Sequence, residues 1–249
     1  SRLIRTSQGN SSYHAMQWRV DRRFARGFQT TASYTWSRNL DSTSEGVGAA
    51  GVEFSQSGAG SRTSVPVAQG GLRLDHGLSD YHRAHRLTVL YLWAVPSPAR
   101  SFWKSAFWKH ALGGWSLAGI ASFQSGAPFT PLNGSDRNND GLPGNDRPDI
   151  SNPRAPLNSR AVLTPASGSQ SCATRYRNPD TGACVTPGDV HWVQGTGLPN
   201  ASTVGRNTLL AGGINNFDVS LSKSFQIGEQ RRLEFRWEAL NALNHPQFT

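Results

Sequence analysis

The amino-acid sequence predicts an all-β fold in which about six long antiparallel strands are joined by loops of very unequal length. Three observations predict it. Apolar and polar side chains alternate with a period of two over stretches of about ten residues, short and long connections follow one another in turn, and Tyr and Trp recur near the ends of the stretches. This combination is typical of part of an antiparallel up-and-down outer-membrane β-barrel, which has short periplasmic turns and long external loops.

The first two strands are predicted near residues 13–23 and 28–37. In the first, Met16, Trp18 and Val20 share one face, and polar side chains occupy the other. In the second, aromatic residues, Ala and Thr hold the even positions, whereas Gln, Thr and Ser hold the odd positions. A tight turn around Arg26–Gly27 is expected to join the two strands.

Two further strands are predicted near residues 86–95 and 115–125, where the alternation is weaker. The side chains expected to share the apolar face are Leu87, Val89, Tyr91 and Trp93 in one strand, and Trp115, Leu117, Ala121 and Phe123 in the other.

The last two strands are predicted near residues 216–227 and 231–241, where the alternation is sharp again and a short turn falls at Gly228–Glu229. Lys223 is the exception, because it lies on the apolar face. Near a strand end its stem could reach a membrane interface, whereas at mid-membrane the lysine would cost roughly 2 to 4 kcal/mol.

The connections and the strand lengths both indicate a membrane barrel. The two long loops, residues 38–84 and 126–215, alternate with shorter connections, of which residues 96–114 form one of medium length, whereas a soluble sandwich has no reason to place its long loops at one end. About ten tilted residues span the hydrocarbon core of a bilayer, and strands of soluble proteins are nearer five or six residues. No stretch approaches the roughly 20 apolar residues that a membrane helix needs.

The chain has 249 residues and a formal net charge of +9. Of the 25 basic residues only Lys104, Lys109 and Lys223 are lysines, and the basic residues are scattered along the chain. No zinc-finger spacing, RNP motif or basic heptad region is present, so we expect no nucleic-acid partner. The charge is interpreted as a dispersed solvated surface or as attraction to anionic lipid and lipopolysaccharide.

The two cysteines, Cys172 and Cys184, lie in a stretch dense in Gly, Pro, Ser and Asn. We expect one disulfide within a loop, with two free thiols as the alternative. A bond that closes a loop of this size contributes on the order of 3 kcal/mol and persists in oxidising compartments, which points outside the cytoplasm.

Four stretches carry a family resemblance: RRFARGFQTTASYTWSRNLD (22–41), DHGLSDYHRAHRLTVLYLWAVP (75–96), LGGWSLAGIASFQSGAPFT (112–130) and GRNTLLAGGINNFDVSLSKSFQIGEQRRLEFRWEALNALNHPQF (205–248). They resemble the C-terminal barrel of TonB-dependent receptor-like outer-membrane proteins, especially the members with an N-terminal carboxypeptidase-regulatory-like domain. The resemblance implies a barrel of about 22 strands with a plugged lumen. Six strands cannot close such a barrel, so we expect the chain to be a fragment of this domain.

The resemblance also implies a function, namely energy-coupled uptake of a scarce, unidentified small ligand without catalysis by the protein. The expected partners are outer-membrane lipid and lipopolysaccharide, and a TonB energy-coupling complex acting through a plug that this chain does not contain. The polar faces of the strands would line the lumen. The residues assigned to this lining are Gln17, Arg19, Asp21, Asp218, Glu234, Arg236 and Glu238. The alternatives are an outer-membrane anchor for adhesive or structural loops, and a secreted soluble β-domain.

The acidic loop DRNNDGLPGNDRPD (136–149) is a candidate calcium site. Asp136, Asn138 and Asp140 fall at positions one, three and five, with Gly at six, as in the start of an EF-hand loop. Position twelve is Arg147 instead of the bidentate Glu. The structural alternative is a polar turn in which Asx side chains bond their own backbone. No other cofactor is expected.

Three weaker patterns each have a structural alternative. His82 and His85 have a spacing that zinc sometimes uses, but residues three apart on an extended chain point to opposite faces. The string GVGAAG (46–51) fits a dinucleotide fingerprint but lacks the flanking strand and helix. The segment SFWKSAFWKHALGGW (101–115) has near-helical spacing of aromatic residues, which suits either an interfacial helix or an irregular turn.

Overall fold

The computed structural model describes residues 9–42, 44, 75–96, 111–139, 146–195, 197–198, 200–227 and 231–246. The chain forms two compact units. The sheet unit comprises His14–Arg38, Arg83–Ala127 and Ala211–Thr249, and the loop unit comprises Ser1–Tyr13, Asn39–His82 and Pro128–Leu210.

Within these described ranges, no helix has both the length and the apolar composition that crossing a membrane would require.

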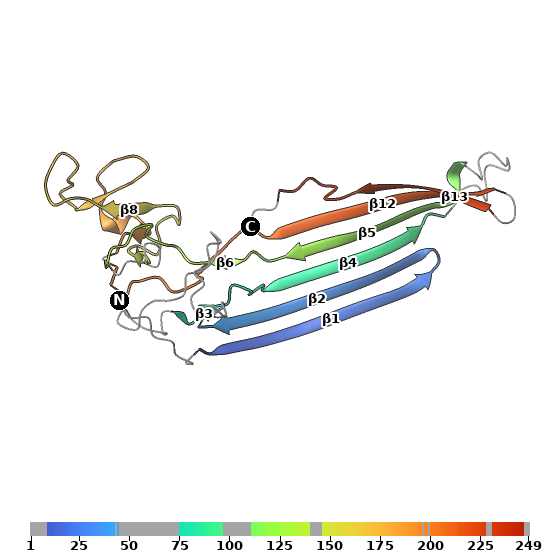
Figure 1. Ribbon diagram of the computed structural model, residues 1–249, viewed down its shortest axis with the longest axis horizontal. Coiled ribbons are helices and arrows are strands. Elements are labelled where there is room, and N and C mark those ends of the chain that lie inside the picture. Colours follow the sequence, from blue (N-terminus) through green and yellow to red (C-terminus); the bar gives the residue numbers. More distant parts are fainter. Residues whose placement is uncertain are drawn as a thin grey trace, which may run out of the picture. The chain divides into compact units, whose positions relative to one another are not determined.

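Six long strands form one antiparallel sheet in which neighbours in sequence are neighbours in space (Figure 1). This up-and-down order confirms the fold class predicted from the sequence. Among the described residues no strand pairs with the outer side of the first or last strand, so the sheet is open at both edges. The strands are β1 (Ser11–Ala25), β2 (Phe28–Asp41), β4 (His85–Ala94), β5 (Trp115–Gln124), β12 (Ile214–Ile227) and β13 (Arg231–Ala239).

Strands β1 and β2 extend beyond the ranges that the alternation predicts, to 15 and 14 residues. Their tight turn takes the left-handed conformation, with φ of 52° at Arg26 and 82° at Gly27. Glycine is required at the second position for two reasons. Positive φ strains residues with a side chain, and a Cβ there would lie 2.8 Å from the backbone oxygen of Ala94. The last residues of β2 also pair with the short strand β3 (Gly77–Leu78).

The register of the ladder fixes which side chains share a face. Phe28 of β2 pairs with Trp93 of β4, which pairs with Leu117 of β5, and Leu117 pairs with Leu221 of β12. Leu221 in turn pairs with Trp237 of β13. Paired residues of an antiparallel sheet point to the same side, so these five positions belong to one apolar face, as the alternation predicts.

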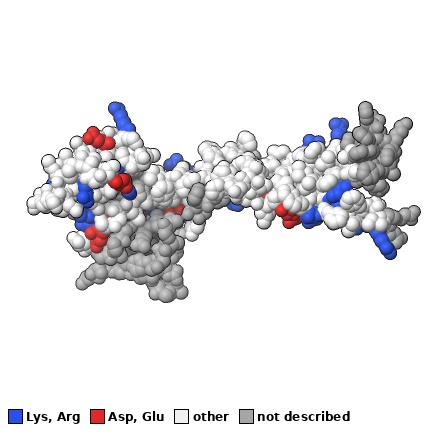
Figure 2. Space-filling view, turned by 90° about the horizontal axis from the view of Figure 1, so that it is seen from above, with Lys and Arg blue, Asp and Glu red and all other residues white. Residues whose placement is uncertain are grey.

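Charge is unevenly distributed over the sheet. Figure 2 looks from above Figure 1 and shows the side of the sheet formed by β12 and β13. On this side mainly Lys and Arg gather near the end at which β1 ends and β13 begins. A sheet that crosses a bilayer needs this distribution, because charge is costly in hydrocarbon and tolerated at the interface.

Lys223 lies on the apolar face of β12, as the sequence indicated, but its ammonium group is satisfied. Its Nζ donates to the backbone oxygens of Ala111 and Gly113, in the segment that precedes β5. The same atom lies 5.2 Å from the ring centre of Trp115 and 4.9 Å from that of Phe225. Backbone acceptors and aromatic faces therefore replace the water that the charge would otherwise need.

The loop unit has its own small sheets. A four-stranded sheet has the order β7-β10-β8-β9, and a separate pair joins β6 to β11. The core is small: Ala161, Val190 and Val193 are buried, and Tyr176 and Val185 pack against them. The elements are β6 (Pro128–Phe129), β7 (Asp149–Ile150), β8 (Arg160–Leu163), β9 (Tyr176–Arg177), the 3-10 turn η3 (Pro187–Asp189), β10 (Trp192–Val193) and β11 (Leu209–Leu210).

Candidate functional site

The candidate site is the face of the sheet opposite the apolar face, which we call the polar face. It carries the side chains that share a side with Asp218 of β12 and Glu238 of β13. All seven residues that the sequence assigned to a lumen lie on β1, β12 or β13. Because β1 and β13 are the two edges of the sheet, the structure divides these residues into two groups instead of joining them in one site.

A ladder of alternating charge runs along β13. Arg232 contacts Glu234 at 2.6 Å, Arg236 contacts Glu234 at 3.1 Å, and Arg236 contacts Glu238 at 3.8 Å. Residues two apart on a strand share a face, so the ladder lines the polar face from one end of β13 to the other. The arginine side chains are about 60% exposed, so these pairs add little stability but keep this edge hydrated.

The second group lies on β1. The guanidinium of Arg19 contacts the Asp21 carboxylate at 2.7 Å. Thr31 of β2 donates its hydroxyl to the same carboxylate at 2.8 Å, which places Asp21 and Thr31 on one face. Gln17 is exposed on the same face of β1 by alternation. Here too the polar groups satisfy one another.

Between the two charged edges the polar face carries an apolar patch, formed by Leu90 and Leu92 of β4 and by Ala118 and Ile120 of β5. Leu90 pairs with Ile120, and Leu92 pairs with Ala118. Leu90, Leu92 and Ile120 are 43%, 39% and 42% exposed. Large exposed apolar groups gathered on an otherwise polar surface are informative, because a hydrated wall does not need them.

Sequence reasoning missed this patch, although a signal was present. The alternation assigned Leu87, Val89, Tyr91 and Trp93 to the apolar face, which leaves Leu90 and Leu92 on the other face. Neighbouring rows of the ladder are polar on both sides of the patch. One row holds Ser33, Thr88, Ser122 and Asn216, and the other holds Ser116 and Ser222, whose hydroxyls lie 3.1 Å apart.

Asp218 borders the patch, because it pairs across the ladder with Ile120. Its carboxylate accepts hydrogen bonds from the backbone N–H of Asn241 at 2.9 Å and from the side-chain amide of Asn216 at 3.0 Å. Both donors are neutral. The salt bridges found among the described residues include none to Asp218, so its negative charge is held in place without being neutralised.

A cavity of about 530 Å³ lies over this region. Its lining combines the apolar patch with Gln29 and Thr31 on one side and Asp218, Ser220 and Glu238 on the other. Volumes of 300 to 1,000 Å³, mainly apolar with a few polar groups, are typical of sites for small molecules. The polar face therefore offers a site for a ligand of that size.

The loop unit contains a cluster of buried charges that the sequence did not reveal. The Arg206 guanidinium is fully buried, donates to the carboxylate of Asp41 and contacts that of Asp80 at 3.3 Å. A second buried pair joins Arg147 to Asp75 at 2.5 Å. The cluster holds together segments that are far apart in sequence, since Arg206 and Asp41 are separated by 165 positions.

Neighbouring polar groups complete the cluster. Arg206 also donates to the hydroxyl of Ser44, and Asn207 donates to Asp80 at 2.6 Å and to the backbone oxygen of Leu78 at 2.7 Å. Gly77 lies so close to Arg206 that a Cβ would come within 2.6 Å of its backbone oxygen. Buried charges are tolerated only when hydrogen bonds surround them in this way.

Burial and pairing act in opposite directions on the charges of the cluster. Burial alone would raise the pKa of Asp41, but hydrogen bonds from Ser79, Arg206 and Ser44, with the Arg206 charge, hold that pKa below its usual value. Burial lowers the pKa of Arg147, which the nearby Asp75 carboxylate opposes. The cluster therefore depends on an ionised Asp41 carboxylate.

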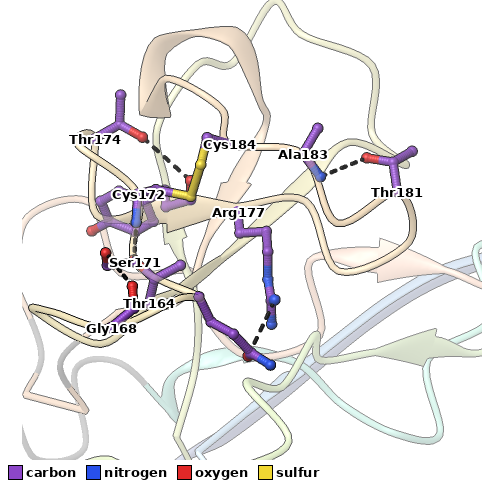
Figure 3. The surroundings of a disulfide bond; sticks show 11 residues. Thr164, Gly168, Ser171, Cys172, Thr174, Arg177, Thr181, Ala183 and Cys184 are labelled. Carbon is purple, nitrogen blue, oxygen red and sulfur yellow. Dashed lines mark hydrogen bonds between the residues drawn. A yellow bond between two sulfur atoms is a disulfide. The ribbon is translucent and has the colours of Figure 1, made fainter.

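A disulfide between Cys172 and Cys184 joins two turns of the loop unit, with the Cα atoms 5.6 Å apart (Figure 3). Local hydrogen bonds order the turns around it. The backbone N–H of Cys172 donates to the Thr164 hydroxyl at 3.3 Å, and the Ser171 hydroxyl donates to the backbone oxygen of Gly168 at 2.7 Å. The bond therefore supports a unit whose apolar core is small.

The structure shows part of the candidate calcium loop. The side chain of Asn138 donates to the Asp146 carboxylate at 2.8 Å, and the backbone N–H of Arg137 donates to the same carboxylate. Asp136 is partly buried, and Asp140 lies outside the described residues. In the described parts of the chain, no group of three or more His, Cys, Asp or Glu could hold a metal ion. Calcium binding stays a prediction.

The two histidines of the zinc pattern have different partners. The Nδ1 atom of His82 accepts a hydrogen bond from the backbone N–H of Asn39 at 3.2 Å. The Nδ1 atom of His85 lies 2.8 Å from the hydroxyl of Tyr34, and the two rings are stacked. Both imidazoles therefore have structural contacts. The glycine string 46–51 and residues 101–110 of the aromatic segment lie outside the described residues.

Comparison with known proteins adds one finding. A family model described as an outer membrane beta barrel domain matches residues 3–249. Neither the curated proteins nor the solved structures contain a match to the chain.

Proposed function

The chain belongs to the outer membrane beta barrel domain family, and on this premise we propose that it forms part of the wall of a TonB-dependent transporter that takes up a scarce ligand. Family membership places the protein in the outer membrane, which overturns the alternative of a secreted soluble β-domain. Transport, the TonB partner and the ligand are the proposed parts.

The observation that carries the proposal is the division of the sheet into two faces of opposite chemistry. One face is apolar across five strands, as lipid contact requires. The other bears a ladder of ion pairs on the β13 edge, an ion pair on the β1 edge and a cavity of about 530 Å³ between them. A wall that only anchored loops would not need a ligand-sized site on its polar face.

The proposed partners follow from these two faces. The apolar face contacts outer-membrane lipid, and lipopolysaccharide would contact its outer rim. The polar face would surround a plug through which an inner-membrane TonB complex supplies energy. In this proposal the chain contributes walls and binding groups and performs no catalysis.

An uptake experiment tests the proposal. Cells with and without the intact gene are given radiolabelled iron chelates, cobalamin and oligosaccharides, each with and without collapse of the inner-membrane proton gradient. We expect uptake of at least one probe to require both the gene and the gradient. Transport would be contradicted if every probe bound to cells only when the gene is present, but to the same extent with and without the proton gradient.

The loop unit favours a second candidate function. A buried ion cluster and a disulfide cross-link this unit internally, which suits an adhesive or structural module. In that case the sheet would serve as an anchor. Surface attachment that is lost when the loop unit is deleted, with uptake of all probes unchanged, would support this function over transport.

A further inference from the structure

We propose that the polar face of the sheet binds a small amphiphilic cation, meaning a molecule with an amine or guanidinium group attached to an apolar body. The site is the cavity over β4, β5 and β12. This inference rests on the proposed transport function, because it names the class of ligand that the wall would accept.

Residues that pair from strand to strand form a row across the sheet. The first argument is the arrangement of side chains in two adjacent rows of this kind. One row runs Thr31, Leu90, Ile120, Asp218, and the next runs Gln29, Leu92, Ala118, Ser220, Glu238. Both rows pass from neutral polar groups through apolar groups to a carboxylate. The gradient of chemistry therefore has the same direction in both rows, so it defines an orientation for a bound molecule.

The second argument is the sign of the charge beside the patch. The carboxylates that line the cavity are those of Asp218 and Glu238, and the cavity has no Lys or Arg in its lining. Asp218 is held by two neutral donors, and the contact of Glu238 with Arg236 is long, at 3.8 Å. An incoming cation would gain charge-assisted hydrogen bonds that the free protein does not make.

The third argument is distance. Neighbouring strands lie about 4.8 Å apart, so Asp218 and Leu90, two strands apart in one row, are separated by about 10 Å. A cationic group at Asp218 would leave a body of one aromatic ring and a short chain above Ile120 and Leu90. Such a molecule fits within about 530 Å³ and covers the apolar side chains that are now exposed.

The test uses the full-length protein that carries this chain, purified from outer membranes into lipid nanodiscs. Binding is measured by calorimetry for three probes of one shape, namely 4-phenylbutylamine, the neutral 4-phenylbutanol and the anionic 4-phenylbutyrate. Empty nanodiscs give the contribution of lipid. We expect saturable binding of the amine, with a Kd about tenfold lower than that of the alcohol, because one charge-assisted contact contributes that much.

Variants assign the effect to the named residues. Asp218→Asn should raise the Kd of the amine about tenfold and leave that of the alcohol unchanged. Leu90→Ala should raise both several-fold. Asp180→Asn, which changes an exposed carboxylate of the loop unit, is the matched control and should leave both unchanged. Circular dichroism verifies folding, and Glu238→Gln replaces Asp218→Asn if that variant does not fold.

Three results would overturn the inference: equal affinity for the amine and the alcohol, an unchanged amine Kd in the folded carboxylate variant, or no saturable binding above that of empty nanodiscs. These binding measurements need no energy coupling. If binding holds and gradient-dependent uptake fails, only the transport proposal is wrong; if uptake holds and the amine does not bind, only the present inference is wrong.

Discussion

The sheet unit and the loop unit of this protein are stabilised in different ways. In the sheet, each strand pairs with its sequence neighbour, and the contacts repeat along a ladder of backbone hydrogen bonds. In the loop unit, the apolar core is small, and buried charges and a disulfide hold together segments that are far apart in sequence. We therefore expect the regular ladder to tolerate the loss of one side chain, whereas the loop unit should depend on a few specific groups.

The largest expected effect comes from removing Arg206. Arg206→Ala leaves the buried carboxylate of Asp41 and the partly buried carboxylate of Asp80 without their guanidinium, which should cost roughly 3 to 5 kcal/mol in the loop unit. Hydrogen exchange measured by mass spectrometry should show faster exchange around Gly77 and Asn207 and unchanged exchange in β4 and β5.

The matched control is Arg160→Ala. Arg160 pairs with Asp180 at 2.7 Å, but both side chains are 58% exposed, so the loss should stay within about 1 kcal/mol. An equal loss of stability in the two variants would mean that the buried cluster stabilises this unit no more than an exposed ion pair does.

Loss of the disulfide should have the next largest effect on the stability of the loop unit. Replacing Cys172 and Cys184 together with Ser should destabilise the loop unit by about 3 kcal/mol, since the unfolded loop regains its freedom. Limited proteolysis should then cut between Thr164 and Cys184 at a lower protease concentration. Resistance equal to that of the parent protein would argue that the surrounding turns need no covalent bond.

A substitution in the sheet should destabilise the sheet unit and leave the loop unit unchanged. The Cβ of Gly119→Ala would lie 2.5 Å from the backbone oxygen of Asp218 and 2.6 Å from the Tyr91 hydroxyl. Overpacking of this kind costs about 1 to 3 kcal/mol. We expect a lower thermal midpoint for the sheet by circular dichroism, with hydrogen exchange of the loop unit unaltered. Weakening of both units together would show that they unfold as one.

Acid should act on the loop unit first. The pKa of Asp41 is lowered in the folded protein, so its ionised form contributes stability that is complete above the ordinary value of 3.8 and is lost as the pH falls through the folded pKa. Protease resistance of the loop unit should therefore decline as the pH falls below about 3.8. Asp41→Asn should weaken this dependence, and an unchanged pH profile in that variant would assign the acid sensitivity to other carboxylates.

The same difference explains what could be predicted from the sequence. Strand β2 could be predicted because its apolar and polar side chains alternate in consecutive residues from Phe28 onward. The ion pair between Arg206 and Asp41 could not be predicted, because 165 positions separate the two residues and neither belongs to a motif. Charged residues in a loop are usually solvated, so sequence alone gave no reason to bury these two.

The candidate site was predicted in part for a similar reason. Asp218 and Glu238 were assigned to the polar face because their own strands alternate sharply. Leu90 and Ile120 were not, since their strands carry apolar residues on both faces and only the pairing register brings them together. The sequence pattern therefore predicted the charged residues at the two edges, whereas the apolar patch between them could be recognised only in the structure.

Labelling of single cysteines in intact cells tests whether this protein is a membrane wall that carries its long loops outside the cell. Asp180→Cys lies in the loop unit and Arg26→Cys in the tight turn between β1 and β2. With a maleimide that cannot cross the outer membrane, we expect Asp180→Cys to react in intact cells and Arg26→Cys to react only after lysis. Equal labelling of both positions in intact cells would contradict this topology.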